Sequence, residues 1–283
     1  MILMVCSNRY REVETMARSL NMIVTAAFLL SFATAGATAD PIEEAAAARL
    51  NGDYTKALRL LRPLADQGNA TAQSSLGFMY ATGQGVPLNH AEAAKWYRLA
   101  ADQGRAPAQY NLGRMYAKGE GVTRDAVEAV KWWRAASEQG HSAAQFNLGI
   151  MYAEGLGVAR NDVEAVKWWR AAADQGDVHA LFNLGVAYAN GQGVPKSIAE
   201  AAALYRLAAD KGHGPAQVNL GLLYDKGGEG IPQDPVRAYM WFNLAASRGY
   251  TVALKGRDSI SKRMTPAQIA EAQKLTREWK QAE

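Results

Sequence analysis

The sequence predicts an all-α fold, a right-handed α-solenoid of stacked antiparallel helix pairs. The pair Leu-Gly returns at a constant step of 36 residues, and alanine, tyrosine and Gly-x-Gly positions recur in phase with it. A period of this length is typical of arrays of stacked supersecondary units. The repeated pairs begin at Leu76, Leu112, Leu148, Leu184 and Leu220.

Residues 1–39 stand apart from the repeats. Residues 22–36 form a nearly uncharged apolar run, with Arg18 before it and small residues after it. This order is typical of a secretory signal peptide, with cleavage after Ala39 and a mature chain that begins at Asp40. A transmembrane anchor is the alternative, but the run is shorter than the roughly 20 residues that cross a bilayer. We therefore expect a periplasmic or secreted protein.

The first 15 residues carry a charged stretch that is unusual ahead of a signal peptide, so Met16 is a candidate for the true start in place of Met1. Cys6, the single cysteine, lies in this leader. The mature chain is thus expected to have no disulfide, no thiolate nucleophile and no cysteine metal ligand. The net charge is +4, and the basic residues are not gathered in a run, which argues against a nucleic-acid-binding protein.

Residues 40–68 are interpreted as a degenerate helix pair that caps the N-terminal end of the stack. Leu60-Leu61 occupies the position of the bulky pair Trp96-Tyr97 one period later. Five repeats of the array follow, at 69–104, 105–140, 141–176, 177–212 and 213–249.

The first helix of each repeat is predicted from an apolar row. Ala72, Leu76 and Tyr80 are spaced i, i+4 and i+8, which puts them on one helix face. A glycine in mid-helix, such as Gly77, costs about 1 kcal/mol relative to alanine, and close approach of a neighbouring helix would explain it. The Gly-x-Gly that begins at Gly83 ends the helix in a tight turn.

The second helix of each repeat carries bulky and small residues in one stripe, as in Ala93, Trp96, Tyr97 and Ala100. A helix pair of 36 residues is too small to bury this stripe alone, so stacked neighbours must cover it. We expect the tryptophans that open the bulky pairs to lie in the core. They are Trp96, Trp132 and Trp168.

Residues 250–283 are predicted to form C-terminal capping helices. The fifth repeat has one extra residue near Gly228, and the pattern stops soon afterwards. Thr265, Pro266 and Gln268 have the order of a capping box with proline at the first helical position. A last helix is expected to run to about Trp279.

These motifs resemble the Sel-1-like repeat, a relative of the tetratricopeptide repeat with a longer turn between the helices. The resemblance rests on Ala-x-x-x-Leu-Gly-x-x-Tyr-x-x-Gly-x-Gly-Val, a Trp-Tyr pair, Ala-Ala and Gly, and it covers roughly residues 69–249. It implies an adaptor or scaffold, as in secretory compartments, bacterial envelope signalling and host contact. Leu181 in place of Gln and Leu204 in place of Trp depart from the pattern.

The same resemblance implies that the side chains opposite the Leu-Tyr face line a concave surface. An apolar row there suggests a groove for a peptide or helix of a partner protein. The alternative is that these side chains pack between successive first helices and meet no ligand. The candidate residues are Phe78, Tyr110, Arg114, Phe146, Ile150, Phe182, Val186, Val218 and Leu222.

A polar column also recurs in the first helices. Its side chains are candidates for a ladder that binds a peptide backbone, although such columns more often link adjacent repeats through backbone carbonyls. The column consists of Ser75, Asn111, Asn147, Asn183 and Asn219.

Signals for catalysis, cofactors and metals are weak, so no enzyme, cofactor or metal is expected. The four histidines stand in separate repeats without metal-ligand spacing, and the Gly-x-Gly motifs lack the Lys-Ser/Thr of a phosphate loop. Ser259 and Lys262 match the Ser-x-x-Lys element of penicillin-interacting serine enzymes without the companion motifs. A penicillin-binding or weakly β-lactamase-like activity, known from cysteine-rich relatives, remains an alternative by analogy. The expected partner is another protein.

Overall fold

The structure is a computed structural model that describes residues 40–281. The predicted signal peptide, its cleavage site after Ala39, the start at Met16 and Cys6 therefore lie outside the described residues. Fourteen helices follow one another in the described range. They are α2 (Pro41–Leu50), α3 (Tyr54–Asp66), α4 (Ala70–Thr82), α5 (His90–Asp102), α6 (Ala106–Lys118), α7 (Ala126–Glu138), α8 (Ser142–Glu154), α9 (Asp162–Asp174), α10 (Val178–Asn190), α11 (Ile198–Asp210), α12 (Gly214–Lys226), α13 (Pro235–Ser247), α14 (Thr251–Ser261) and α15 (Pro266–Gln281).

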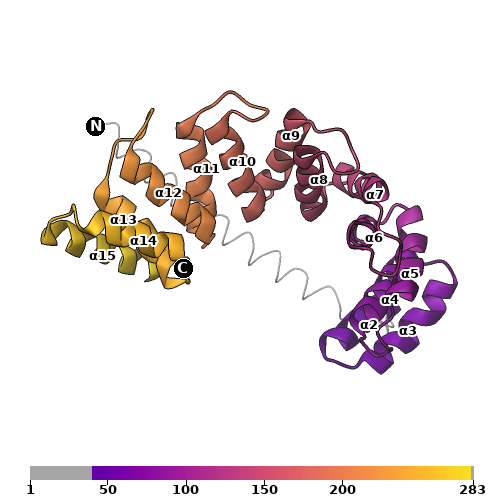
Figure 1. Ribbon diagram of the computed structural model, residues 1–283. Coiled ribbons are helices and arrows are strands. Elements are labelled where there is room, and N and C mark those ends of the chain that lie inside the picture. The colour runs from indigo at the N-terminus through magenta and orange to yellow at the C-terminus, as the bar shows by residue number, and fades with distance from the viewer. Residues whose placement is uncertain (1–39, 282–283) are drawn as a thin grey trace, which may run out of the picture.

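The helices pack as successive pairs, which confirms the predicted α-solenoid. Figure 1 shows the pairs following one another along an arc, from α2 at one end to α15 at the other. Around the middle of the arc, α6 and α8 lie toward its inner side and α7 and α9 toward its outer side. The first helices α4 and α6 also contact each other directly. Around the middle of the arc the first helices therefore supply the inner face, as the resemblance implied.

The glycine of each Leu-Gly pair lies against an aromatic ring from the second helix of its own repeat. A Cβ atom placed on Gly113 would come within 2.7 Å of Cδ1 of Trp133, which is closer than real Cβ contacts allow. The same holds for Gly149 and Trp169, at 2.5 Å. The prediction of a close helix approach at these glycines is confirmed. Because glycine has no side chain, it leaves the space that the ring occupies.

The two bulky residues of each second helix have different neighbours. The second of the pair faces the glycine, whereas the first packs against the cluster of the preceding unit. Trp132 is buried as predicted, but Trp96 and Trp168 are only half-buried, so their assignment to the core was wrong in degree. Consecutive helix residues point about 100° apart, which leaves these two rings at the edge of the interface. Cationic groups lie over them, with Cζ of Arg62 at 5.3 Å from the Trp96 ring.

Glutamine side chains connect successive repeats across the interior. Gln109 donates from Nε2 to the carbonyl of Ala101 in the preceding repeat (3.2 Å), and its Oε1 accepts from Nε2 of Gln139 at the end of α7 in its own repeat (2.8 Å). In the fourth repeat both glutamines of the pair are replaced, the first by Leu181 and the second by Lys211. The equivalent glutamine pairs are Gln73 with Gln103 and Gln145 with Gln175.

A second ladder links α3, α5, α7 and α9 each to the first helix that follows. Arg134 donates to the hydroxyl of Tyr152 (2.7 Å), and Arg170 donates to that of Tyr188 (2.8 Å). The repeated tyrosine is therefore both a packing residue and a hydrogen-bond acceptor. The same pairing joins Arg62 to Tyr80 and Arg98 to Tyr116.

The turns explain why both glycines of Gly-x-Gly are needed. Gly119 ends α6 in the left-handed conformation, with φ at 74°. A Cβ on Gly121 would lie 2.2 Å from the carbonyl of His90, so the turn packs against the start of the preceding second helix. In the longer fifth turn, Gly228 and Ile231 form an isolated β-bridge.

The C-terminal end closes as predicted. The backbone N–H of Thr265 donates to Oε1 of Gln268 (2.9 Å), and the N–H of Gln268 donates to Oγ1 of Thr265 (3.3 Å), which is a capping box. The last helix ends at Gln281, close to the expected Trp279. The Trp279 ring packs edge-on against Trp241, at 6.2 Å between ring centroids, and so helps to cover the last repeat.

Candidate partner-binding surface

The predicted inner row is a set of partly covered side chains on α4, α6, α8, α10 and α12. Phe78, Phe146 and Phe182 are half-buried, and each packs against the core cluster of the following unit. Val218 is the most covered, at 9% exposure, and Leu222 is the most open, at 37%. Both lie on α12, so exposure varies most at the C-terminal end of the row. The remaining members, all half-buried, are Tyr110, Arg114, Ile150 and Val186.

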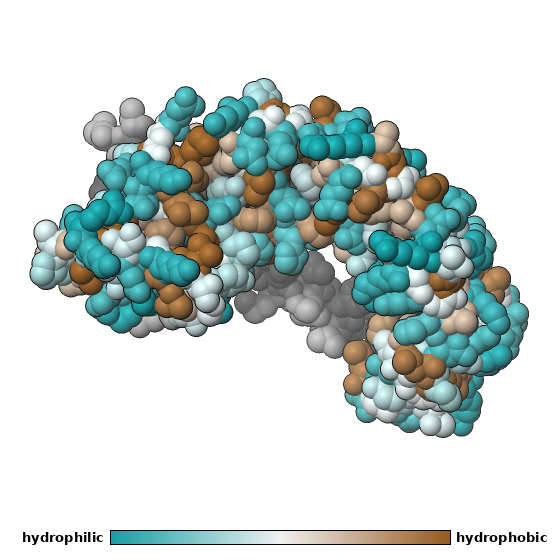
Figure 2. Space-filling view, viewed as in Figure 1, coloured by the Kyte–Doolittle hydropathy of each residue, from teal (hydrophilic) through white to brown (hydrophobic). Residues whose placement is uncertain are grey.

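This arrangement is consistent with both alternatives left open by the sequence. The row does pack between successive repeats, and each half-buried side chain also keeps a part of its surface in contact with solvent. Figure 2 shows hydrophobic side chains scattered among hydrophilic ones on the visible face of the arc. The role of the row in binding remains a prediction.

Histidines extend the aromatic row, a feature that the sequence analysis missed. His141 stacks on Tyr110 at 4.6 Å between centroids, and His213 lies 4.9 Å from Phe182. His179 stands 5.2 Å from His213. The rings therefore form an aromatic surface that crosses from one repeat to the next.

Two of these histidines are also helix caps. Nδ1 of His141 accepts from the N–H of Ala144, and Nδ1 of His213 accepts from the N–H of Ala216, each at 3.3 Å. Burial lowers the pKa of both, and His179 lowers the pKa of His213 further. Both effects keep the imidazole neutral, which the cap requires because a protonated Nδ1 cannot accept.

The asparagine column has several different neighbours. Asn111 donates to the carbonyl of Pro107 in its own helix (2.9 Å), and Asn219 shares a hydrogen bond with Tyr205. Asn183 lines an open pocket described below, and Asn147 and Ser75 are half-buried. A continuous amide ladder for a peptide backbone therefore stays a prediction, with Asn111 and Asn219 already engaged within the protein.

Charge on the inner face changes sign along the array. The guanidinium carbon of Arg49 lies 4.8 Å from the ring centroid of Phe78, and Nε of Arg114 is buried without a hydrogen-bond partner among residues 40–281. Farther along, Glu154 ends α8 with its side chain exposed. Asp225 accepts from Arg263 and so carries a paired charge. The cationic side chains named here thus lie in the N-terminal half of the inner face.

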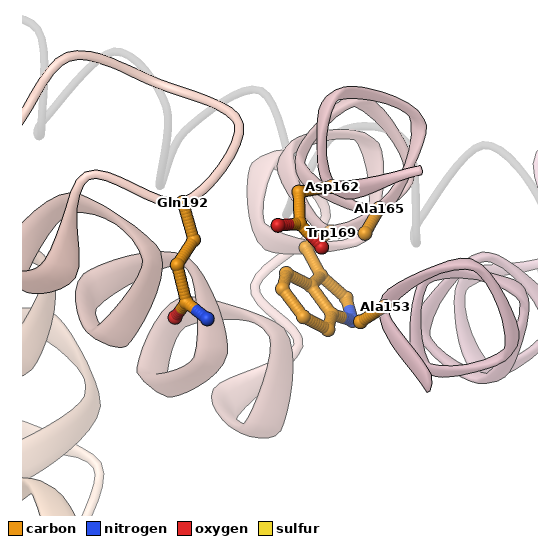
Figure 3. A pocket seen from close by; sticks show the side chains of 5 residues that line it. All are labelled: Ala153, Asp162, Ala165, Trp169 and Gln192. Carbon is orange, nitrogen blue, oxygen red and sulfur yellow. The ribbon is translucent and has the colours of Figure 1, made fainter. Parts of the chain in front are cut away.

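An open pocket of about 210 Å³ lies between α8 and α10. Trp169 forms part of its wall, and a smaller neighbouring pocket of about 40 Å³ touches the same ring. Figure 3 shows the side chains of Asp162 and Gln192 at the gap beside the indole, with Ala153 at its other edge. The larger pocket is lined by Ile150, Ala153, Glu154, Trp169, Asn183, Val186, Ala187 and Gln192.

The candidates for catalysis lie at the C-terminal end of α14 and outside the pocket. Ser259 is exposed on α14, Lys262 is the exposed cap of that helix, and neither lines the pocket between α8 and α10. The described residues hold no group of three or more His, Cys, Asp or Glu side chains placed to bind a metal ion. Among helices α2 to α15, none has the length and hydropathy to cross a membrane.

Comparison with known proteins identifies the repeats. The Sel1 repeat family model matches residues 48–69, 70–104, 106–141, 142–177, 178–213 and 214–250. Its first match falls in the segment interpreted above as the N-terminal cap. No match was found among curated proteins.

Two solved structures are similar over most of the chain. A Sel1 repeat protein from Oxalobacter formigenes shares 36% identity with a TM-score of 0.73, over 86% of this chain and 96% of that one. The protein c5321, a protective antigen present in uropathogenic Escherichia coli strains and displaying an SLR fold, shares 31% identity with a TM-score of 0.59. That match covers 84% of this chain and 59% of c5321. Sel1 repeat proteins are in general non-catalytic protein-interaction scaffolds. The family matches and the Leu-Gly packing agree, and the chain belongs to the Sel1 repeat family.

Proposed function

We propose that this protein is a non-catalytic scaffold that holds a peptide or helix of a partner protein along its inner face. The observation that carries the proposal is the row of mostly apolar, mostly half-buried side chains at two recurring positions of successive first helices, from Phe78 to Leu222. Such a row offers apolar area at regular intervals, as helix-in-groove and peptide-in-groove recognition require.

We further propose that the protein works in the periplasm or after secretion, in envelope signalling or host contact. The apolar run at residues 22–36 and the small residues before Asp40 support this location. Mass spectrometry of the N-terminus of the protein purified from its host tests it. We expect the purified chain to begin at Asp40, and a chain that still contains residues 1–39 would contradict the proposed location.

The binding proposal is tested by placing a charge on the inner row. Phe146→Glu and Phe182→Glu are each expected to abolish recovery of the partner when the native envelope is crosslinked and analysed by mass spectrometry. A buried or half-buried carboxylate at the interface would have to be desolvated on binding. The same variants are melted in parallel, because both rings also pack within the protein.

The array supplies its own controls on the outer helices. Val127 and Val163 are 63% and 62% exposed near the starts of α7 and α9. Val127→Glu and Val163→Glu make the same chemical change away from the inner row and should leave partner recovery unchanged. If Phe146→Glu and Phe182→Glu lower the melting temperature but recover the partner normally, the row serves packing alone and the proposal is wrong.

A further inference from the structure

The pocket between α8 and α10 exists where one repeat departs from the others. The residue three positions after each Leu of the Leu-Gly pairs is methionine in the first three repeats and alanine in the fourth, at Ala187. These methionines are buried, with exposures of 0%, 1% and 6%. The shorter side chain of Ala187 forms part of the pocket wall. The aligned residues are Met79, Met115, Met151, Ala187 and Leu223.

This departure is unfavourable for stability taken alone. Removing side-chain atoms from a packed interior loses transfer free energy and contacts, and the loss grows with the space left behind. The indole of Trp169 also differs from its counterpart one repeat earlier. Nε1 of Trp133 donates to the carbonyl of Tyr110 (3.1 Å), whereas Nε1 of Trp169 is buried without a partner within the described chain.

The lining has two chemical parts. Ile150, Val186 and the face of Trp169 supply apolar and aromatic surface, and Glu154 brings an exposed carboxylate to the same pocket. Glu154 takes part in no ion pair within residues 40–281, whereas Asp162 beside Trp169 is held by Arg160 at 3.0 Å. The net uncompensated charge of the lining is therefore negative.

We propose that this pocket receives one basic side chain, lysine or arginine, from the partner segment held on the inner face. Its aliphatic stem would lie against Ile150 and Val186, while its cation would meet the carboxylate of Glu154 near the Trp169 ring. Long basic side chains combine an apolar stem with a charged end, and indole is the aromatic ring that attracts cations most strongly. The inference rests on the proposed function and names the anchor of that interaction.

The probe is a phage-displayed library of random dodecapeptides, selected on the full chain and then tested on variants. Peptides that need the pocket should share a lysine or arginine at one position and should be lost when the pocket is filled by Ala187→Met, which restores the residue of the first three repeats. Ala187→Leu, with the residue of the fifth repeat, fills the same space and guards against a folding defect in either variant. Both variants should melt at or above the wild-type temperature.

The anchor is then measured with one selected peptide by fluorescence polarisation. Replacing its basic residue with norleucine, which keeps the stem and removes the charge, should weaken binding roughly tenfold, and Glu154→Gln should have an effect of the same size. An effect of Glu154→Gln that persists with the norleucine peptide would show that the carboxylate does not meet the basic group and would overturn the proposal.

The outcomes separate the two proposals. Peptides that are lost on Phe146→Glu and Phe182→Glu but bind normally to Ala187→Met and Ala187→Leu would uphold the inner face and overturn the pocket. Peptides that need the pocket but share an apolar or acidic residue would overturn the basic anchor. A selection that yields no peptide sensitive to either the row or the pocket would overturn the binding face itself, and the anchor with it.

Discussion

Replacing Gly113 with alanine tests the packing rule on which the whole array depends. In an isolated helix this substitution is favourable by about 1 kcal/mol, because alanine has the higher helix propensity. Here the new Cβ would come within 2.7 Å of Cδ1 and 2.8 Å of Nε1 of Trp133. The indole cannot move freely, since it is 6% exposed and its N–H is bound to the carbonyl of Tyr110.

The expected result is destabilisation by about 1–3 kcal/mol. Overpacking of a core typically costs about 1–3 kcal/mol, and displacement of the ring adds about 1 kcal/mol for the lost hydrogen bond. The helix-propensity gain of about 1 kcal/mol offsets part of this sum. Urea denaturation followed by circular dichroism measures the change.

A double-mutant cycle separates the contact with Trp133 from the helix propensity of residue 113. Trp133→Ala removes the ring and should by itself cost about 3–5 kcal/mol. In that background Gly113→Ala meets no ring, so the same substitution should now stabilise the protein by about 1 kcal/mol. The sign of the Gly113→Ala effect must reverse. If alanine at Gly113 stabilises the protein with Trp133 intact, the glycine is not required by the ring and the account is refuted.

Two further predictions concern the links between repeats and the helix caps. Gln145→Leu should cost about 1–3 kcal/mol in urea denaturation, because it removes two hydrogen bonds, one to the carbonyl of Ser137 and one from the amide of Gln175, at about 0.5–1.5 kcal/mol each. Adding Gln175→Lys, the combination that the next repeat carries, should recover part of the loss, and an unchanged midpoint for the single variant would contradict the ladder. Because burial and the neighbouring histidine lower the pKa of His213, its contribution is fully present above the unfolded value of about 6.5 and is lost as pH falls through the folded pKa. His213→Asn keeps a helix-capping side chain, of the kind found at Asn69, but removes the imidazole. The fall in melting temperature between about pH 7 and pH 5 should therefore be smaller in this variant than in the wild type. An equally steep fall in the variant would show that the His213 imidazole does not cause it.

The sequence was sufficient for features that every repeat must satisfy. The constant spacing of the Leu-Gly pairs predicted the helix pairs, and the mid-helix glycine predicted a close approach that the Gly113 contact confirms. The capping box at Thr265 and Gln268 was also predicted correctly. These features follow from local geometry, in which residue types have fixed consequences for backbone and packing.

Features that depend on the angle between repeats were not predicted. The half-exposure of Trp96 follows from where the preceding unit sits, and periodicity within one helix does not specify that position. The contacts of His179 and His213 likewise join residues of neighbouring repeats. The pocket did leave a signal in the sequence, since Ala187 breaks a column of methionines, but an alanine on a buried helix face is unremarkable until the column is aligned.

Several departures from the repeat pattern gather in the fourth repeat. Leu181 and Lys211 replace the glutamine pair, Leu204 replaces a tryptophan, and Ala187 replaces a methionine. In a solenoid each unit contacts its neighbours alone, so a weakened interface affects local stability and leaves distant repeats intact. An array can therefore give up packing at one interface and keep its overall fold. The pocket lies at the interface between the third and fourth repeats, and its wall includes Ala187. A binding anchor placed there would use the space that a methionine side chain fills in the first three repeats. The fourth repeat is therefore the place to look for what distinguishes this chain from other arrays of the same period.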